Sequence, residues 1–468
     1  MLRYLLRVTP AFSLTLFVSS LVSHVQACSL CEDAAEATFV GASAPVSVAS
    51  APAPALSSRP GAPYTVYLNF DGFTYSGNWA GRPPGTVPAY TGTSAQLTEA
   101  WARVAEKYAA FDVNVTTVDP SGFAPTDYLS RQNYYDTTAR VMQTIIGGNN
   151  AWYNAGAGGV SYVDVFRDAH AAGSGYHTNW AFPLNLRNNQ PKAVAEAVTH
   201  EAGHGFGLWH QTDYNLNPGN SYSTNGGATG DGSYAPQMGT TYNSQRGTWR
   251  VGTFGGGGGA FQNDVATILS NPGLSLAGSG GNTFDTATAL PLTGSLLDSV
   301  GGVIVPLSES APNPIGIENY SRDFFRFSLA APGDVTLNLA NGGDWITPGV
   351  AAPGATLRSR LNLYRADNRA TPFAFGLEAT DTMSSTFSAM LGAGDYFAEI
   401  TSFGGYASTY DTTAKYFDMG SYTLRGAIIP VVVPEGGTFV LLGAGVAAFV
   451  VLRRRTGNRD ARSGITCS

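Results

Sequence analysis

Three histidines within eleven residues are the feature of this sequence with the clearest chemistry. The stretch HEAGHGFGLWH covers residues 200 to 210 and holds half of the six histidines in the 468-residue chain. His200 and His204 are four residues apart in a segment rich in helix-forming residues, so they would project from one face of a helix. That spacing brings two imidazoles to one metal ion.

The residues around this pair complete a site suited to Zn²⁺. Gly207 can adopt the left-handed conformation that ends a helix, which would let His210 return as a third ligand. Three neutral histidine nitrogens leave the fourth zinc position open to water, and this distinguishes catalytic from structural zinc sites. Glu201, beside the first ligand, can take a proton from that water and pass it to a leaving amine. The set predicts metal-assisted hydrolysis of a peptide bond.

The pattern His-Glu-x-x-His-x-x-Gly-x-x-His resembles the motif of the metzincin zinc endopeptidases at every fixed position. The resemblance implies an α+β zincin (metzincin-like) catalytic domain with a mixed sheet and an active-site helix. It assigns the metal to the three histidines and the general base to Glu201. It also implies a methionine in a tight turn beneath the metal, and Met238 in YAPQMG lies 28 residues after His210. Some metzincins carry a tyrosine ligand two residues after this methionine; here that residue is Thr240, so no tyrosine ligand is expected.

A mixed α/β layer is predicted to position these residues across 63–274. Pro191 suits the first turn of the helix that carries the motif, because the N–H that it lacks has no partner there. Thr93 and Gln96 are spaced as a capping box for an earlier helix. Strand patterns occur in YTVYLNF (64–70), FDVNVTTV (111–118) and RVMQTIIG (140–147). In YTVYLNF the alternating apolar residues predict one buried face.

The segment GAGGVSYVDVF (156–166) resembles the edge strand to which metzincins add a substrate peptide. An ordinary sheet edge is an equal interpretation, because one sequence does not fix strand order. The loop 211–236, rich in Asn, Gly, Ser and Tyr, would line one wall of the cleft. Calcium could bind among loop Asp and Asn residues, but no run has the spacing of a calcium loop.

Beyond the glycine-rich stretches at 255–260 and 278–281 the pattern becomes all-β. FFRFSL, DVTLNL, RLNLYRA and GDYFAEI alternate apolar and polar residues between turn residues, which predicts a β-sandwich over 282–428. This region is similar to the bacterial pre-peptidase C-terminal domains that follow secreted proteases. The resemblance implies an accessory role in secretion, folding or substrate contact, and a stabilising spacer is the alternative.

The N-terminal residues predict export. Residues 1–27 combine leading arginines, the apolar run FSLTLFVSSLV and the cleavage pattern Val25-Gln26-Ala27, as in a signal peptide. Residues 28–62 are rich in Ala, Ser, Pro and Val and read as a linker or pro-segment. Cys28 and Cys31 could form a local disulfide, Cys28 could carry a lipid, or one thiolate could cap the zinc until the segment is removed.

The C-terminal residues 434–455 resemble the PEP-CTERM class of bacterial sorting signals, whose tail is cut by a membrane enzyme. Two features depart from that class: Gly436 replaces the second proline, and a basic tail of thirteen residues (456–468) follows Arg455. The 15 uncharged residues from Thr438 to Leu452 would span about 22 Å as a helix, against roughly 30 Å of hydrocarbon. A transient membrane contact is therefore expected, with retention as an anchor the alternative.

The charge of the chain limits the classes of partner that it can bind. A net charge of −7 without a basic tract in the body of the chain excludes nucleic acid as the main partner. The sequence predicts an exported, secreted or cell-surface bacterial zinc endopeptidase that acts on proteins or peptides and meets the sorting machinery for exported proteins. The alternative is a surface adhesin or matrix protein with a structural zinc site, against which Glu201 counts.

Overall fold

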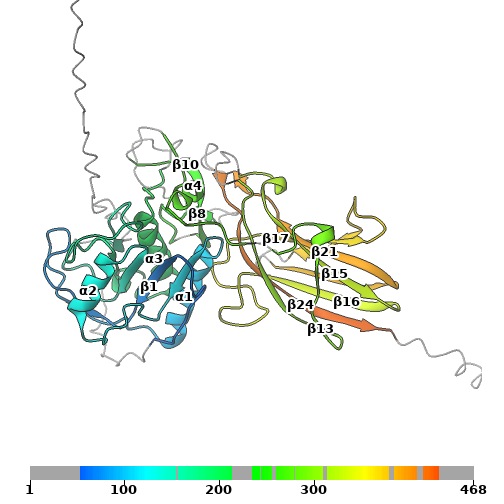
Figure 1. The fold of residues 1–468 in the computed structure, drawn as a ribbon, viewed down its shortest axis with the longest axis horizontal. Coiled ribbons are helices and arrows are strands. Elements are labelled where there is room, and N and C mark those ends of the chain that lie inside the picture. Colours follow the sequence, from blue (N-terminus) through cyan, green and yellow to red (C-terminus); the bar gives the residue numbers. More distant parts are fainter. Residues whose placement is uncertain are drawn as a thin grey trace, which may run out of the picture. The chain divides into compact units, whose positions relative to one another are not determined.

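The computed structural model describes residues 53–153, 156–212, 234–242, 244–255, 260–278, 280–308, 314–378, 384–407 and 415–431. They belong to two compact units (Figure 1). The first ends at Leu276 and also includes Tyr406–Phe417, and the second begins at Ala277. The predicted signal peptide, residues 28–52 of the predicted linker with both N-terminal cysteines, most of the loop 211–236, the segment 434–455 and the basic tail lie outside the described residues.

A five-stranded mixed sheet forms the centre of the first unit, in the order β4-β1-β5-β7-β6. Its strands are β1 (Tyr64–Asn69), β4 (Val113–Thr116), β5 (Val141–Ile146), β6 (Gly159–Val160) and β7 (Thr178–Ala181). Strands β4, β1, β5 and β7 run parallel to one another, and β6 runs antiparallel to β7. Together with the helices, this confirms the predicted α/β region with a mixed sheet.

Strand β1 is buried on both faces, although its sequence pattern predicted one buried face. Tyr67 stacks on Tyr135 of α2 (Tyr128–Thr137), with ring centroids 5.9 Å apart. Tyr64, on the opposite face, contacts Phe206 at the end of α3 (Pro191–Gly205), with centroids 5.8 Å apart. Parallel sheets are covered on both sides in this way because their connections cross over the faces.

Both predicted helices begin as their sequences indicate. Helix α1 (Ser94–Tyr108) has the complete capping box between Thr93 and Gln96. Helix α3 has Pro191 in its first turn and ends at Gly205, and Gly207 has a φ of +102°. The expected left-handed glycine after the motif helix is confirmed.

Residues 54–59, within the predicted linker, lie along the free edge of β4. Ser58 N–H donates to Val115 O at 3.0 Å, and Thr117 N–H donates to Leu56 O at 3.0 Å. The carboxamide oxygen of Asn114 accepts from Ser57 Oγ at 2.8 Å and from Arg59 N–H at 3.0 Å. The folded part of the first unit thus begins before residue 63.

The predicted edge strand is shorter than its sequence suggested, since only Gly159–Val160 pair with β7. Asp164 then has a φ of +60°, and the chain leaves the sheet. Asp164 N–H donates to His204 O at 2.9 Å, and Phe166 N–H donates to Gly205 O at 3.0 Å. The last carbonyls of α3 have no partner within the helix, and these donors satisfy them.

Smaller elements complete the first unit. They are β2 (Phe73–Thr74) paired with β3 (Thr86–Val87), β8 (Tyr234–Pro236) paired with β9 (Arg246–Thr248), the 3₁₀ turn Pro183–Asn185 and α4 (Asp264–Leu269). A four-stranded sheet has the order β11 (Phe261–Asn263), β10 (Arg250–Thr253), β23 (Lys415–Tyr416) and β22 (Tyr406–Ala407).

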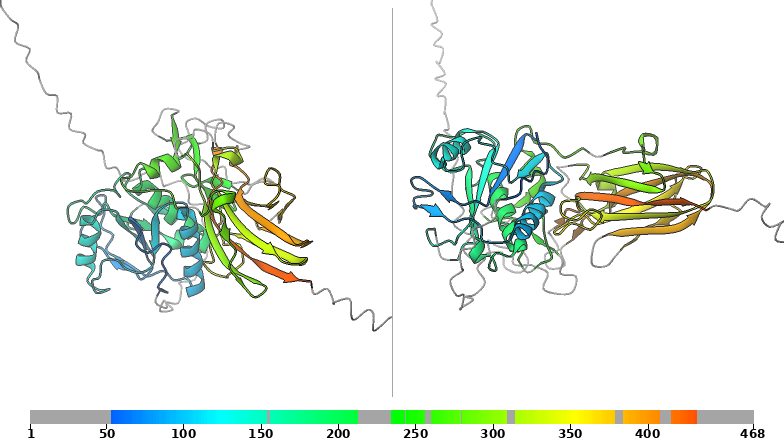
Figure 2. Two further views of the ribbon diagram at one scale, coloured as in Figure 1. Left: turned by 45° about the vertical axis from the view of Figure 1, so that its right-hand side comes forward. Right: turned by 90° about the horizontal axis from the view of Figure 1, so that it is seen from below.

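The second unit is all-β, as predicted, and is a β-sandwich of a five-stranded and a six-stranded sheet (Figure 2). The first sheet contains β12 (Thr288–Ala289), β15 (Arg322–Leu329), β21 (Gly394–Ser402), β17 (Ser359–Arg365) and β18 (Ala374–Phe375). The second contains β13 (Leu292–Thr293), β14 (Leu296–Ile304), β24 (Gly420–Pro430), β16 (Gly333–Asn341), β20 (Ser385–Leu391) and β19 (Leu377–Glu378). Short 3₁₀ turns lie at Phe284–Thr286 and Ile317–Asn319. Within the described ranges, no helix is both long and apolar enough to cross a bilayer.

Candidate metal centre

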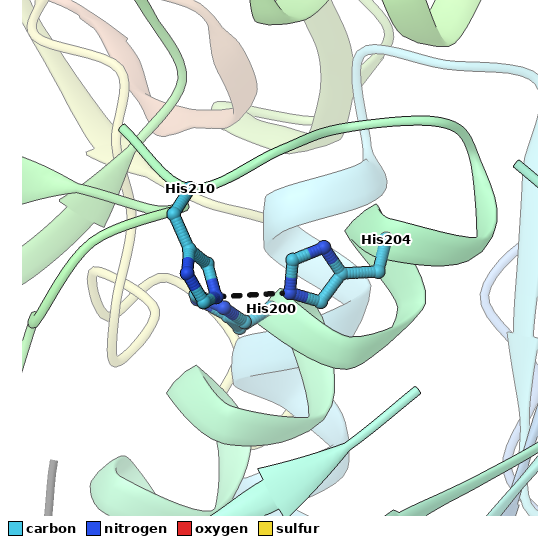
Figure 3. A group of neighbouring side chains, drawn as sticks. All are labelled: His200, His204 and His210. Atoms are coloured by element: carbon cyan, nitrogen blue, oxygen red, sulfur yellow. Dashed lines mark hydrogen bonds between the residues drawn. The ribbon is translucent and has the colours of Figure 1, made fainter. Parts of the chain in front are cut away.

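The three histidines of the motif meet at the end of α3. Figure 3 shows His200 and His204 on the helix and His210 on the segment that follows it, with the rings turned toward one another. The Nε2 atoms of His204 and His210 are 3.2 Å apart, and the candidate ligand atoms of all three residues lie within 4.8 Å. All three side chains are buried.

Backbone carbonyls fix the orientation of two of the rings. His200 Nδ1 lies 3.0 Å from Gln237 O, and His204 Nδ1 lies 2.7 Å from Leu208 O. A carbonyl oxygen only accepts, so each Nδ1 carries a proton, and Nε2 is the nitrogen that has the lone pair when the ring is neutral. Such a contact to the second ring nitrogen is the usual support of a metal-binding histidine.

The nitrogen spacing fits zinc. Tetrahedral zinc with Zn–N bonds of about 2.0–2.1 Å separates its nitrogen ligands by roughly 3.3–3.4 Å. The 3.2 Å between the Nε2 atoms of His204 and His210 is close to this value. Imidazole nitrogens also suit other transition metals, so the buried cluster can bind a metal ion of this class.

A tight reverse turn after α3 brings His210 back to the helix. Gly207 N–H donates to His204 O at 2.8 Å, and Leu208 N–H donates to Gly203 O at 3.1 Å. These bonds satisfy terminal carbonyls of the helix while Gly207 holds its positive φ. The motif glycine is therefore required by backbone geometry.

Met238 lies in a tight turn directly against α3. Gly239 N–H donates to Pro236 O at 2.9 Å, which closes the turn. A Cβ built on Gly203 would be 2.7 Å from the Met238 sulfur, so the sulfur packs against α3 at the residue before His204. The turn also supports the site through its backbone, because Met238 O accepts from Gln211 N–H at 2.8 Å.

A buried polar group beneath His200 was not found from the sequence. Gln237, which supplies the carbonyl to His200, donates through Nε2 to Glu196 O at 3.0 Å. The Glu196 carboxylate accepts from Gly247 N–H at 3.2 Å and lies 3.7 Å from Lys107 Nζ. Glu196 precedes His200 by one helical turn, and that spacing on one face was the available signal.

The charges of this group are set by burial and by their mutual contacts. Burial disfavours ionisation of Glu196, but Lys107 and Lys192 outweigh it and hold the pKa of its carboxyl below the ordinary value. Burial lowers the pKa of Lys107 to about 8, although Glu196 acts in the opposite direction. An ion pair inside the unit thus anchors the middle of α3.

Glu201 is buried against the edge strand β6. A Cβ built on Gly159 would lie 2.6 Å from Glu201 Oε1 and 2.8 Å from Trp180 O. Only glycine leaves room for the carboxylate at this point of the strand. The hydroxyl of Tyr242 lies 2.9 Å from the Cβ position of Gly158 on the same segment.

A second buried network follows His210 and was also missed. Gln211 donates through Nε2 to Asp264 Oδ1 at 2.8 Å and accepts from Arg250 Nε at 2.6 Å. Gln262 also donates to Asp264 Oδ1 at 2.8 Å. Burial raises the pKa of Asp264 to about 6, although its hydrogen bonds and the Arg250 charge act to lower it.

Comparisons with known proteins identify no family for this chain. The sequence matches no known family profile and no curated protein. It is similar to the pre-peptidase C-terminal domain of a collagenase from Bacillus anthracis, with 14% identity over 30% of this chain and 93% of that domain and a TM-score of 0.18. It is also similar to a periplasmic inhibitor of g-type lysozyme from Aeromonas hydrophila, with 11% identity over 30% of this chain and 96% of the inhibitor and a TM-score of 0.17. At these TM-scores neither likeness carries an argument about function.

Proposed function

We propose that this chain is an exported zinc-dependent endopeptidase of the metzincin type. His200, His204 and His210 hold the zinc, and Glu201 is the general base. The observation that carries the proposal is the joint placement of a three-histidine cluster and a buried carboxylate packed against an edge strand at Gly159. The first feature suits a metal and the second suits proton transfer beside an extended peptide.

The chain's own residues have separate roles in this reaction. Bound zinc supplies a Lewis acid that polarises the scissile carbonyl and lowers the pKa of a water molecule. Glu201 accepts the proton of the attacking water at a carboxylate oxygen and returns it to the amine that leaves. The backbone of β6 orients the substrate, because an extended peptide can add to the free side of an edge strand.

The edge strand β6 is suited to this role by its sequence. Within the described ranges β6 pairs with β7 alone, so one side of its backbone has no strand partner. Gly158 and Gly159 carry no side chain that would hold a peptide away from the strand. The alternative function, an adhesin or matrix protein with a structural zinc site, gives no reason for Glu201 to be buried at this strand.

The proposed export of the chain and its remaining partners are inferred from the sequence alone. The signal-like residues 1–27 direct the chain out of the cytoplasm of a bacterium, to a secreted or cell-surface location. The segment 434–455 brings it to the sorting machinery and at least transiently to the membrane. The β-sandwich serves secretion, folding or substrate contact, and nucleic acid is not a partner.

Metal content and hydrolysis measured on the same samples test the proposal. The full exported chain should contain one zinc and cleave casein or gelatin, and a chelator should abolish the cleavage. Glu201→Gln should keep the zinc and lose about 10³-fold in rate, the scale of general-base catalysis. Glu99→Gln, the same chemical change at an ion pair of α1, should leave both quantities unchanged.

Two outcomes would contradict the proposal in different ways. A chain that binds zinc but cleaves no member of a broad peptide library favours the structural-zinc alternative. If the chain binds no zinc, both the endopeptidase and the structural-zinc alternative are wrong. A fully active Glu201→Gln variant would refute the role of this carboxylate while leaving the metal in place.

A further inference from the structure

A short segment from the C-terminal part of the chain belongs to the first unit. Residues Tyr406–Phe417 follow strand β21 and precede strand β24, both of which are strands of the β-sandwich. Strand β23 of this segment pairs antiparallel with β10, with Tyr416 opposite Arg250 and Lys415 opposite Val251. Phe417 N–H extends the pairing by donating to Trp249 O at 3.0 Å.

The segment shares its edge of β10 with the residues that follow His210. Thr212 N–H donates to Thr253 O at 2.9 Å, and Gln211 forms an antiparallel bridge with Phe254. Gly255 N–H donates to His210 O at 2.8 Å. Strand β10 therefore has two neighbours on one edge. Residues 210–212 lie beside its C-terminal end, and β23 lies beside its N-terminal end.

Arg250 connects the two neighbours. It lies opposite Tyr416 in the ladder, and its fully buried side chain donates to Gln211 Oε1 at 2.6 Å and to Thr212 O at 2.6 Å. A buried guanidinium keeps such geometry only while water is excluded, since water competes for the same acceptors. Strand β23 covers this part of β10, and Tyr416 and Phe417 are themselves buried.

We infer that the strand at Lys415–Phe417 completes the metal-binding unit and fixes His210 through Arg250 and Gln211. This inference rests on the proposed metal site but not on proteolysis. The metal-binding unit is then discontinuous in sequence, and a chain that ends near residue 276 lacks β22 and β23, two of the four strands of the sheet that contains β10. A cleavage that releases the C-terminal part before residue 406 would lower metal affinity, which makes this strand a point of control.

A pair of substitutions at one residue tests the inference in the full chain. Phe417→Pro removes the N–H that binds Trp249 O, whereas Phe417→Leu keeps the N–H and most of the apolar volume. The zinc dissociation constant, measured by competition with a chromophoric chelator, should rise at least tenfold for Phe417→Pro and change less than twofold for Phe417→Leu. The Co²⁺ absorption spectrum should change for the proline variant alone. Zinc affinity unchanged by Phe417→Pro would overturn the inference.

Two further measurements keep the inference testable. Leu337→Ala, in the core of the β-sandwich, should leave zinc affinity unchanged if β23 acts by its pairing and not through the stability of the second unit. Hydrogen exchange on the unmodified chain should place the amides of Val251 and Phe417 in one opening unit with those of α3. Exchange of Phe417 together with β16 and β24, while β10 stays protected, would contradict the inference.

The two proposals fail separately. A chain that binds zinc and cleaves nothing contradicts the endopeptidase, but the zinc affinities of the Phe417 variants still test the strand. If the unmodified chain binds no zinc, the inference loses the metal site on which it rests, and hydrogen exchange then tests only the pairing of Phe417 with β10.

Discussion

The two edges of the five-stranded sheet differ in how their backbones are covered. At the β4 edge, residues 54–59 run alongside the strand and bind it through backbone and side-chain hydrogen bonds. At the β6 edge, the strand is two residues long, and among the described residues it pairs with β7 alone. An open strand edge invites pairing with another chain, so most edges of folded proteins are covered or blocked.

The difference indicates which edge serves the fold and which one the proposed endopeptidase would use for its substrate. Asn114 on β4 accepts hydrogen bonds from both Ser57 and Arg59, so the covering segment is fixed by a side chain of the strand itself. Gly159 on β6 has no side chain, and the Glu201 carboxylate occupies the adjacent space. We therefore expect substitutions at β4 to change stability and substitutions at β6 to change catalysis.

The largest effect is expected at Gly159. Gly159→Ala would place a Cβ 2.6 Å from Glu201 Oε1 and 2.8 Å from the backbone oxygen of Trp180, so the carboxylate must move. We expect kcat/KM for a casein-derived peptide to fall about a thousandfold, which corresponds to about 4 kcal/mol of transition-state stabilisation. The zinc content should stay at one per chain, measured on the same sample.

Two comparisons assign that loss to Glu201. Gly278→Ala adds a Cβ that meets nothing within 4 Å and should leave activity unchanged. The double variant Gly159→Ala with Glu201→Gln should be no slower than Glu201→Gln alone, because both changes remove the same proton transfer. Additive losses would mean that Gly159 acts on the reaction by another route.

An intermediate effect is expected at the β4 edge. A chain that begins at residue 63 lacks the hydrogen bonds of residues 54–59, whereas one that begins at residue 53 keeps them. The shorter chain should lose roughly 2–4 kcal/mol of stability, because these part-buried hydrogen bonds each contribute less than about 1 kcal/mol. The midpoint of thermal unfolding of the first unit should fall by about 5–10 °C.

The rate of peptide cleavage shows whether the β4 edge contributes to stability alone or also to catalysis. Well below its unfolding temperature, the shorter chain should cleave peptide at the rate of the longer one, because β4 lies at the far end of the sheet order from β6. Asn114→Ala in the longer chain should reproduce a smaller part of the stability loss, since it removes two of the bonds. Equal stability of both chains would show that residues 54–59 are dispensable.

Local patterns predicted the parts of the molecule that are encoded locally. The capping box at Thr93, the first-turn Pro191 and the left-handed Gly207 each depend on residues within one or two turns, and each is present. The meeting of the three histidines follows from the same local geometry, because two lie on one helix face and the third follows a tight turn. The motif needed no long-range information.

Features that depend on distant pairing were not predicted. Residues 54–59 have no strand period, and their partners on β4 lie more than fifty residues away, as Ser57 and Asn114 do. The short length of β6 reflects the competing need of the α3 carbonyls for donors near Asp164. The pairing of β23 with β10 joins Arg250 and Tyr416, which are 166 positions apart, and no local pattern in either strand indicates it.

The smallest effect is expected at neither edge but in the sheet that contains β10. It concerns the pH dependence of stability that arises from Asp264, which we expect to be independent of both edges. Burial raises the pKa of Asp264 to about 6, from 3.8 in the unfolded chain. Between these values the folded chain retains a proton that the unfolded chain has lost. Stability from this group is therefore fully present below 3.8 and declines as pH rises toward 6. From about pH 4.5 to about pH 6 the loss should be about 1–2 kcal/mol.

Urea unfolding of the metal-free chain across this pH range measures the contribution, since zinc binding would add its own pH dependence. Asp264→Asn should reduce the decline in unfolding free energy by that amount, because the amide does not titrate. Asp168→Asn, at a carboxylate that is 74% exposed, should leave the decline unchanged. The chain that begins at residue 63 should show the same decline at lower overall stability, because the β4 edge and Asp264 contribute independently. If the free energy of unfolding of Asp264→Asn still declines with pH, another group in the unit releases the proton. If the truncation alters the decline, the β4 edge and the sheet that contains β10 are coupled.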